Sequence, residues 1–291
     1  MKLALYGRPS QARQKGFLES LLNLLEEKQI EWKIYKPFFE DLFRDGEFKN
    51  AKTFSSSREA ISETDFVISI GGDGTLLDTL TFVQNSGIPV VGINTGRLGF
   101  LATIHKDEIS QALDGLLKGH FSLDKRTLLR LDSNKNCFGE NNFALNELTI
   151  HKKDTSSMIT LHAYLNGEYL NSYWADGLII STPTGSTGYS LSCGGPILVP
   201  QSESFVINPI APHNLNVRPI IVSDKNTISI EVEGRSQHFM ASLDSRSETI
   251  DGSVQLAIRK EDFTLNLVRL NNQNFLDTLR TKLVWGLDMR N

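Results

Sequence analysis

The feature that most constrains the fold is a short apolar segment that runs directly into a glycine-rich turn. Residues 66–70 read Phe-Val-Ile-Ser-Ile, and Gly71-Gly72-Asp73-Gly74 follows them before a helical pattern begins. A short apolar run bounded by glycines is typical of a buried strand. Glycines at its exit let the backbone approach a ligand closely, and the N–H groups at the start of the next helix can receive phosphate oxygens. The segment therefore predicts a strand–turn–helix unit that can bind an anion.

An acidic residue lies inside this turn. A carboxylate next to bound phosphates repels them unless a divalent cation or a substrate hydroxyl intervenes. Asp73 is therefore better suited to act as a general base, or to contact magnesium, than to hold phosphate. The alternative interpretation is a tight turn in which Asp73 caps the helix, because short glycine motifs also occur without any ligand site.

The first third of the chain repeats the alternation of strand and helix. Residues 2–7 and 89–93 read as further strands. Apolar residues with helical spacing follow them, at Phe17, Leu21, Leu24 and Leu25 and at Ile109, Leu113, Leu116 and Leu117. Such alternation predicts a parallel sheet with helices on its faces. Residues 38–58 show no clear period, and we expect a mobile loop there.

Beyond about residue 120 a period of two replaces the helical pattern. Residues 159–165 precede the turn signal Asn166-Gly167, which predicts a β-hairpin, and residues 228–233 and 254–258 also alternate. Leu276, Leu279 and Leu283 then return to helical spacing. We expect a Rossmann-like α/β domain of residues 1–120 and 271–291 with a parallel sheet. A β-sandwich-like domain of residues 121–270 should follow, and the C-terminal helix should pack back on the first domain.

Composition narrows the class of protein. The 291 residues suffice for two modest domains, and 30 basic against 34 acidic residues give a net charge of −4. No basic field favours a nucleic-acid partner. Two cysteines, Cys137 and Cys193, are too few for a disulfide scaffold and fit a reducing cytosol. No apolar stretch approaches the ~20 residues of a membrane helix, and no signal peptide is evident. We expect a soluble cytoplasmic protein without membrane contact.

Several familiar motifs are missing from the sequence. No Gly-Lys step occurs, which excludes a P-loop, and the turn at residues 71–74 lacks the third glycine of the dinucleotide fingerprint. His-Glu-x-x-His, Cys-x-x-Cys and Gly-x-Ser-x-Gly are also missing, which excludes by motif the zinc proteases, zinc ribbons and serine hydrolases. Phosphoryl transfer remains.

A second dense motif follows an apolar strand in the second half. Residues 182–189 read Thr-Pro-Thr-Gly-Ser-Thr-Gly-Tyr. They offer several hydroxyls and bare N–H groups beside one aromatic ring, a set suited to a ribose, a phosphate and a stacked base. The alternative is a Ser/Thr-rich loop between strands, because loops are commonly built of these residues.

Taken together, five motifs resemble the bacterial NAD kinase (ATP-NAD kinase) family. They occur in the order of that family: the turn at residues 71–74, Asn94-Thr95-Gly96-Arg97-Leu98-Gly99-Phe100-Leu101, Asn146-Glu147, residues 176–200, and residues 208–219. The glycine turn alone is shared with other kinases, but the five together are specific. The resemblance implies that the γ-phosphate of ATP is transferred to the 2′-hydroxyl of the adenosine ribose of NAD, which yields NADP. ATP and NAD are then the substrates.

The resemblance also implies roles for individual residues. Asp73 would be the general base and contact NAD, with Gly74. Mg²⁺ or another divalent cation would bind through the ATP phosphates without a protein cage. The phosphate cradle would comprise Gly71, Gly72, Gly74 and Thr75. Asn146 suits an adenine edge, Glu147 suits ribose hydroxyls, and Asp176 lies near the other half of the dinucleotide.

The binding loop implied by the resemblance consists of Thr187, Gly188, Tyr189, Ser190, Leu191 and Ser192. Within it Tyr189 would stack on adenine. Further candidate contacts are Leu77, Phe100, Trp174, Ala211 and Arg246. The family resemblance also implies a homodimer or homotetramer. We expect a structural role for His213 and a small packing role for Cys193, which has no basic neighbour in sequence.

The chain departs from the family pattern at three places. Trp174 stands where many relatives carry a basic residue, so stacking replaces a charge contact and the preference between NAD and NADH is affected. Gly188 stands where many have Ala. The common Asp-Gly-Gln is here Asp244-Ser245-Arg246, and we hypothesise that Arg246 supplies the positive charge missing at Trp174.

Two other functions fit parts of the sequence. A lipid kinase of the diacylglycerol type shares the glycine turn and the two-domain plan, but it would not need Asn146-Glu147 or residues 184–192. A noncatalytic NADP-binding sensor would keep the pocket without turnover, although retention of Asp73 favours an enzyme. ATP-dependent turnover distinguishes the sensor from the kinase.

Overall fold

The computed structural model describes residues 1–9, 14–43, 48, 50–96, 99–153, 157–270 and 274–284. The chain divides into two compact units, residues 1–125 with 265–291 and residues 126–264. The division falls within two long strands, β7 (Phe121–Ser133) and β18 (Leu256–Leu270). Within the described ranges, no helix has the length and apolar character needed to span a membrane.

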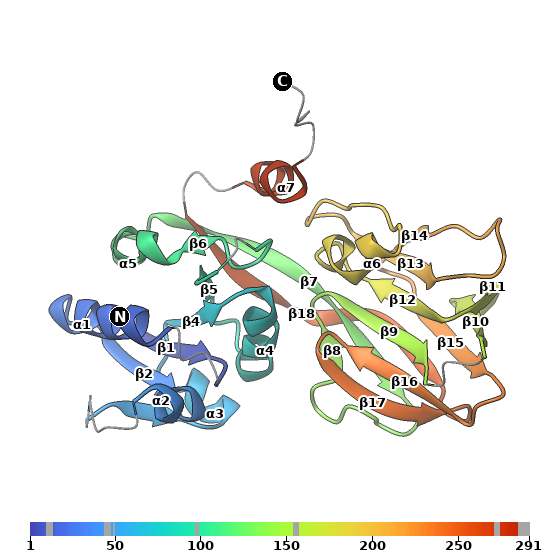
Figure 1. Ribbon diagram of the computed structural model, residues 1–291, viewed down its shortest axis with the longest axis horizontal. Coiled ribbons are helices and arrows are strands. Elements are labelled where there is room, and N and C mark those ends of the chain that lie inside the picture. The colour runs from blue at the N-terminus through green and yellow to red at the C-terminus, as the bar shows by residue number, and fades with distance from the viewer. Residues whose placement is uncertain are drawn as a thin grey trace. The chain divides into compact units, whose positions relative to one another are not determined.

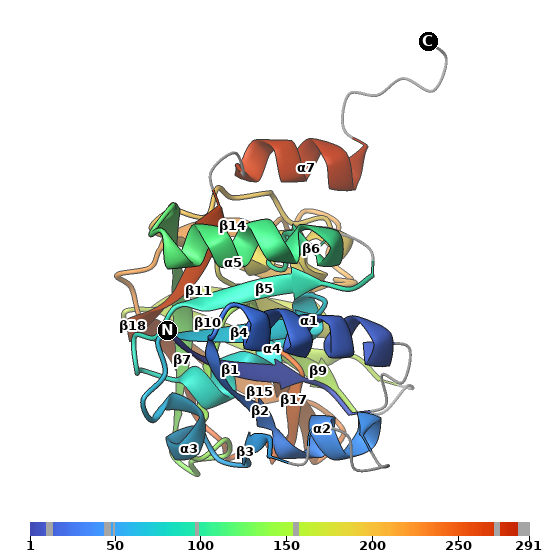
Figure 2. The same ribbon diagram turned by 90° about the vertical axis from the view of Figure 1, so that its left-hand side faces the viewer.

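The first unit contains a parallel sheet. Its strand order is β3-β2-β1-β4-β5. In Figure 2 these strands run from β5 at the top to β3 at the bottom. The bounds are β1 Lys2–Gly7, β2 Glu31–Tyr35, β3 Lys52–Phe54, β4 Phe66–Gly71 and β5 Val90–Asn94. The short strand β6 (Ile104–His105) pairs with β5, and Leu267 of β18 pairs with Val90. Every one of these pairings is parallel.

Helices cover both faces of this sheet. Figure 1 shows α1 (Lys15–Glu27) and α5 (Ile109–Leu117) on one face and α4 (Asp73–Val83) on the other. The predicted apolar stripes face the core, since Leu21 and Leu25 of α1 and Leu113 of α5 are fully buried. The 3₁₀ turn η2 (Lys106–Glu108) leads into α5, and α7 (Phe275–Leu283) is the last helix described.

The prediction of a mobile loop over residues 38–58 is wrong for the described part of that segment. It contains most of α2 (Lys36–Leu42), β3 and the start of α3 (Ser57–Ile61). Phe38, Phe43 and Phe54 are buried there. Elements of three to seven residues are too short to display a period, and their aromatic side chains contribute burial in place of a repeating stripe.

The second unit consists of antiparallel strands. One set of strands runs β11 (Glu168–Ala175), β10 (Ile159–Leu165), β15 (Ile228–Glu233) and β18. A six-stranded sheet has the order β14-β13-β12-β9-β16-β17. The bounds are β14 Ile220–Ser223, β13 Ser204–Ile210, β12 Gly177–Ser181, β9 Glu147–Lys152, β16 His238–Leu243 and β17 Arg246–Asp251. The two-residue strand β8 (Phe143–Ala144) pairs with β7.

Side chains of both strand sets form one hydrophobic core. Leu161 and Ile230 come from one set, and Ile150, Ile180 and Phe205 come from the six-stranded sheet. Alternate residues of each strand point inward, as in β15 with Ile228, Ile230 and Val232. The predicted hairpin at Asn166-Gly167 joins β10 to β11.

The fold-class prediction is therefore confirmed. A parallel α/β sheet and an antiparallel β unit are both present, and the last helix belongs to the first unit. Leu279 of α7 is 4% exposed, so part of the apolar stripe of this helix is buried.

Candidate active site

The glycine turn follows the carboxyl end of β4. Gly71 is the last strand residue, Gly72 caps α4, and Asp73 is the first residue of that helix. Gly71 has φ of +155°, and a β-carbon built on it would lie 2.2 Å from Oγ1 of Thr75. The turn therefore needs glycine for its backbone angle and for the close approach of Thr75. Asp73 is not the helix cap, because Gly72 occupies that position.

Three backbone N–H groups hold the carboxylate of Asp73. Phe100 donates to Oδ2 at 2.8 Å, while Leu101 and Ala102 donate to Oδ1 at 3.1 and 3.0 Å. A carboxylate offers about four lone-pair sites. The contacts fix the side chain and still leave capacity to accept a hydrogen bond from a hydroxyl.

The loop that supplies these donors is built around small residues and amides. A β-carbon on Gly99 would lie 1.8 Å from Oδ1 of Asp73. Asn94, at the end of β5, accepts from the N–H of Gly96 at 2.7 Å, and Thr95 donates to the carbonyl of Gly71 at 3.1 Å. Phe100 and Leu101 belong to the family motif at residues 94–101 and Ala102 follows it, but the motif alone does not show that these N–H groups hold Asp73.

Arg8 is a neighbour of this turn that sequence reasoning missed. The parallel register pairs Gly7 of β1 with Ile70 of β4, which brings Arg8 beside the turn. Its Nη2 donates to the carbonyl of Gly74 at 2.9 Å, and its Nε pairs with Asp78. This ion pair raises the pKa of the guanidinium. No local motif signals Arg8, because only the strand order places it there.

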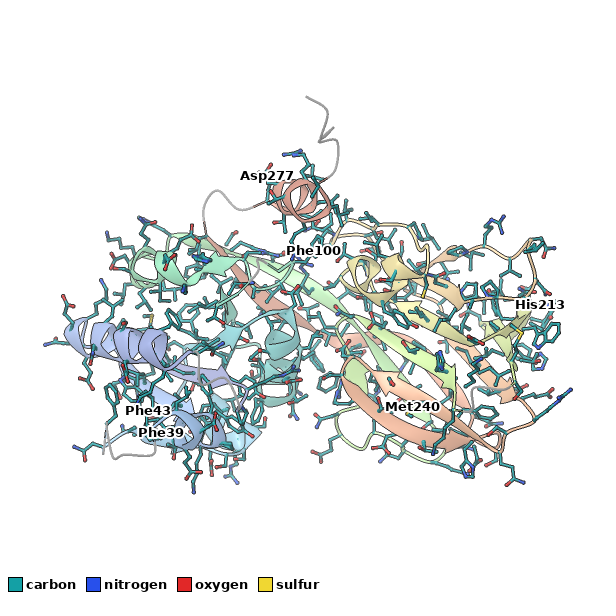
Figure 3. The ribbon with its side chains drawn as sticks, viewed as in Figure 1. Phe39, Phe43, Phe100, His213, Met240 and Asp277 are labelled. Carbon is teal, nitrogen blue, oxygen red and sulfur yellow. The ribbon has the colours of Figure 1, made fainter. Side chains whose placement is uncertain are left out.

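Two further predicted site residues, Leu77 and Phe100, belong to the first unit. Leu77 lies half-buried on α4. Phe100, which Figure 3 labels, is half-buried too. Lys282 of α7 lies over its ring, 6.0 Å from the centroid.

In the second unit, an acidic side chain holds the Asn146-Glu147 pair. Asp244, between β16 and β17, accepts the N–H groups of Leu145, Asn146 and Glu147 at 2.9, 2.8 and 3.2 Å. It has φ of +52°, which Asp tolerates better than most residues. Burial raises the pKa of its carboxyl despite these donors. Asp244, in the Asp-Ser-Arg segment that differs from the family pattern, therefore fixes the backbone of residues 145–147.

The loop after β12 packs directly against this pair. A β-carbon on Gly185, the first residue of η3 (Gly185–Thr187), would lie 2.1 Å from the carbonyl oxygen of Asn146. The N–H of Thr182 donates to the same oxygen at 2.9 Å. A β-carbon on Gly188 would lie 3.3 Å from Oε2 of Glu147. Residues 36 or more positions apart in sequence therefore meet in one place.

The carboxyl group of Glu147 has an unusual environment. Its Oε2 is buried and has no hydrogen-bond partner among the described residues. Burial, and next the charge of Asp244, raise the pKa of Glu147 to about 8. Buried polar atoms are almost always paired, so this oxygen points to a ligand.

Tyr189 provides an exposed aromatic ring in the short helix α6 (Tyr189–Ser192), with 41% of the residue exposed. Burial raises the pKa of its phenol, with smaller contributions from Cys193, Asp176 and Glu147. Burial also raises the pKa of Cys193, which favours the neutral thiol.

Asp176, between β11 and β12, forms an ion pair that the sequence did not suggest. Lys152, the last residue of β9, lies 2.5 Å from its Oδ1, and the Lys152 N–H donates to the Asp176 carbonyl. Lys152 is therefore the basic residue beside this acid. The register of β9 on β12 brings the two together.

The ring of Trp174 contacts another ring of the protein in a tilted arrangement. The residue is 45% exposed, and its ring lies 4.3 Å from that of His213, whose N–H donates to the Trp174 carbonyl. His213 is exposed and is labelled in Figure 3. Ala211 is exposed with φ of +45°.

Other residues of the predicted loop serve its internal structure. Ser190 is fully buried and accepts from Nδ2 of Asn208 through its carbonyl and its hydroxyl. Thr187 donates to the carbonyl of Thr184 at 3.1 Å. Leu191 is half-buried, and Ser192 is exposed.

The guanidinium of Arg246 is engaged within the second unit. It donates to the carbonyls of Asn141 and Phe143, and it lies 5.5 Å from the centroid of the Phe143 ring. These contacts tie β17 to the segment around β8.

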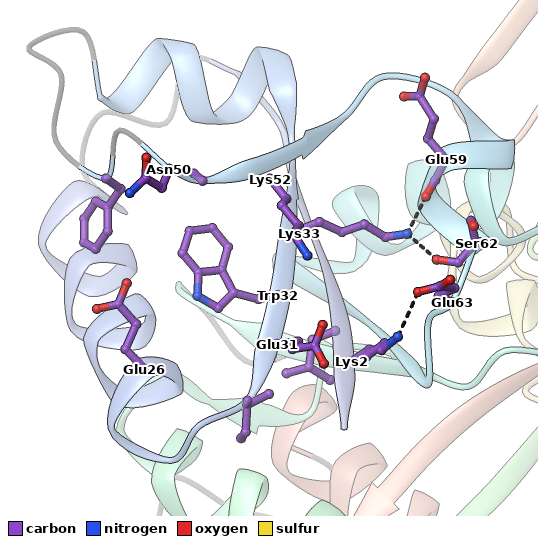
Figure 4. A pocket seen from close by; sticks show the side chains of 14 residues that line it. Lys2, Glu26, Glu31, Trp32, Lys33, Asn50, Lys52, Glu59, Ser62 and Glu63 are labelled. Atoms are coloured by element: carbon purple, nitrogen blue, oxygen red, sulfur yellow. Dashed lines mark hydrogen bonds and ion pairs between the residues drawn. The ribbon is translucent and has the colours of Figure 1, made fainter.

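A cavity of about 610 Å³ in the first unit lies away from these residues (Figure 4). It is lined by the starts of the parallel strands, with Lys2 of β1, Trp32 of β2 and Lys52 of β3. Open parallel sheets bind ligands at the opposite, carboxyl ends. None of the predicted site residues lines it. Across the described ranges, no group of three or more His, Cys, Asp or Glu side chains could hold a metal ion.

Comparison with protein-family models matches both parts of the chain. The model described as the ATP-NAD kinase N-terminal domain matches residues 16–121, and that of the C-terminal domain matches residues 145–270. A NAD kinase of Cytophaga hutchinsonii is 50% identical over 100% of both chains. A NAD kinase of Bacteroides fragilis is 43% identical over 100% of both.

Solved structures share the fold. The yeast NADH kinase complexed with NADH has a TM-score of 0.88 and 22% identity, with 100% of this chain and 89% of that chain covered. An NAD kinase from Archaeoglobus fulgidus in complex with ATP has a TM-score of 0.77 and 24% identity, with 98% and 99% covered. On the two matched domains and the full-length identities, the chain belongs to the NAD kinase family of enzymes.

Proposed function

We propose that the chain makes NADP by transferring the γ-phosphate of ATP to the 2′-hydroxyl of the adenosine ribose of NAD. The observation that carries the proposal is the carboxylate of Asp73. It lies in a glycine turn at a helix start, three backbone N–H groups hold it, and no basic side chain pairs with it in the described structure. A base for a hydroxyl needs this combination of fixed position and free acceptor capacity.

The chemical step is an in-line displacement. The 2′-hydroxyl donates a hydrogen bond to Asp73, and its oxygen attacks the γ-phosphorus. The new O2′–P bond forms, the bond from the γ-phosphorus to the bridging oxygen of ADP breaks, and the proton passes to the Asp73 carboxylate. Phosphoryl transfer needs little covalent help, so alignment of the hydroxyl supplies much of the rate.

The glycine turn would hold the donor phosphates. Gly71 and Gly74 shape the turn, a β-carbon on Gly72 would meet nothing within 4 Å, and the first N–H groups of α4 point out of the helix start. The side chain of Thr75 packs closely against Gly71. The turn would receive these phosphates together with Mg²⁺ or another divalent cation, which would neutralise their charge.

The second unit would bind the dinucleotide. Asn146 would contact the adenine edge, and Glu147, protonated below pH about 8, would pair its buried oxygen with a ribose hydroxyl. Tyr189 offers its exposed ring for stacking on adenine. Asp176 would contact the other half of the dinucleotide, and residues 187–192 would form the rest of the binding loop. We also propose a homodimer or homotetramer, which light scattering after size exclusion would measure.

A coupled assay tests the reaction with NAD, ATP and magnesium, beside Asp73→Asn and with diacylglycerol as an alternative acceptor. NADP formation that falls in Asp73→Asn is the expected result. Phosphorylation of diacylglycerol in place of NAD would favour the lipid kinase. Saturable NADP binding by calorimetry without any turnover would favour the noncatalytic sensor.

A further inference from the structure

A mostly buried arginine side chain contacts the loop that holds Asp73. Arg269, on β18, pairs through Nε with Oδ2 of Asp124 on β7 at 3.2 Å, and the two side chains are only 12% and 14% exposed. Its Nη1 donates to Oγ1 of Thr103 at 2.9 Å, and its Nη2 donates to the carbonyl of Phe100 at 3.4 Å. One guanidinium thus connects a carboxylate, a hydroxyl and a backbone carbonyl.

These contacts lead to Asp73 through a single peptide group. The carbonyl of Phe100 and the N–H of Leu101 belong to the same planar amide. Arg269 donates to the oxygen of that amide. The N–H of the same amide, on Leu101, donates to Oδ1 of Asp73 at 3.1 Å. A cation at the oxygen polarises the amide and strengthens its N–H as a donor, and burial enlarges the effect.

The same guanidinium also fixes where the loop lies. Thr103 follows Ala102, the third residue that donates to Asp73, and Thr103 itself is 8% exposed. Arg269 therefore holds both ends of the donor segment, at the carbonyl of Phe100 and at the hydroxyl of Thr103. The planar fork of arginine can reach these acceptors together, whereas the point charge of a lysine cannot.

We infer that Arg269 is a positioning residue for phosphoryl transfer, and that it acts on Asp73 through the peptide between Phe100 and Leu101. The inference rests on the proposed role of Asp73. Arg269 contacts neither substrate; it determines where the carboxylate lies and which donors hold it. Nothing in the motifs marks Arg269, which is distant in sequence from the turn at 71–74.

The test is a double-mutant cycle of Arg269→Lys with Asp73→Asn. Lysine keeps a positive charge opposite Asp124, so the buried carboxylate retains a partner. In the wild-type background we expect kcat to fall about 10- to 100-fold, the range expected for a slightly misplaced catalytic group. KM for NAD and ATP should change little, because the interaction acts on the transition state. In the Asp73→Asn background the same change should alter kcat less than about 2-fold.

A matched control lies on the same strand. Arg259→Lys alters another arginine of β18, whose Nε pairs with Asp132 at 2.8 Å, and it should leave kcat unchanged in both backgrounds. If Arg269→Lys does not fold, as judged by its melting temperature, Thr103→Val removes one contact of the guanidinium and should show a smaller loss with the same dependence on Asp73.

The outcomes separate this inference from the proposed function. Wild-type turnover by Asp73→Asn overturns the role of Asp73 whatever Arg269 does. If Asp73→Asn loses turnover but Arg269→Lys lowers kcat by the same factor in both backgrounds, Arg269 acts independently of Asp73 and the inference is wrong. An unchanged kcat for a folded Arg269→Lys overturns it as well.

Discussion

The α-carbon of Gly99 lies against the carboxylate of Asp73, so closely that a β-carbon on Gly99 would stand 1.8 Å from Oδ1. No other side chain fits between the loop and the acid. The approach lets three consecutive residues after Gly99 direct their N–H groups at the carboxylate. The position of the proposed base therefore depends on a glycine in a different segment of the chain.

Gly99→Ala should displace the carboxylate or the loop. We expect kcat to fall about 10- to 100-fold, because misplacing a catalytic group by about 1 Å costs this much. Steady-state kinetics of NADP formation measures the change. Gly96→Ala is the matched control, since a β-carbon there meets nothing within 4 Å. Equal activity of the two variants would contradict the proposed geometry.

Asp73→Asn should separate catalysis from binding. The amide keeps the size of the side chain but cannot take a proton, so turnover should fall by ~10²–10⁴-fold, the usual scale of general-base catalysis. Calorimetric binding of NAD should persist. Turnover close to that of the wild type would remove the assignment of Asp73 as the base.

Glu147→Gln should change how stability depends on pH. Burial raises the pKa of Glu147 to about 8 from 4.5 in the unfolded chain. The folded state therefore keeps a proton that the unfolded state loses, and stability declines as pH rises from 4.5 to 8. Glutamine cannot ionise, so the melting temperature of the variant relative to wild type should rise between pH 5 and 8.5.

Thermal melts at several pH values measure this difference, with Glu140→Gln, an exposed acid, as the control. A melting-temperature difference that stays constant across this range would show that Glu147 ionises alike in the folded and unfolded states.

Gly185→Ala and Gly188→Ala should differ in stability. A β-carbon on Gly185 would meet the backbone oxygen of Asn146 at 2.1 Å, which no rotamer change relieves. We expect a loss of roughly 1–3 kcal/mol or more in the free energy of unfolding. On Gly188 the nearest atoms are at 3.2 and 3.3 Å, so a shift of a few tenths of an ångström accommodates the methyl group. Denaturant melts of both variants test the contrast.

Arg246→Ala tests whether Arg246 contributes charge to dinucleotide binding. The compensation hypothesis predicts a higher KM for NAD, while the contacts with the carbonyls of Asn141 and Phe143 predict a lower melting temperature. The two effects are measured separately, by initial rates and by thermal melts. A lower melting temperature with an unchanged KM would show that Arg246 is structural and that the charge hypothesis is wrong.

Local patterns were sufficient for the strands and helices that have a strong period. Residues 66–74 predicted a strand, a turn and a helix start, and the structure places β4, Gly72 and α4 there. The alternation over residues 159–165 and 228–233 likewise predicted β10 and β15. Residues 38–58 escaped this reasoning, because three short elements with buried phenylalanines display no period.

The sequence by itself determined the class of each half of the chain, the glycine turn around Asp73 and the family resemblance, because periodicity, glycine placement and motif order are local properties of a chain. Only the tertiary structure decided what surrounds each candidate. Strand register and packing produce four contacts: Arg8 with the glycine turn, Lys152 with Asp176, Asp244 with Asn146-Glu147, and Arg269 with the loop that holds Asp73. These contacts join residues far apart in sequence, and no local pattern contains the partner of a side chain.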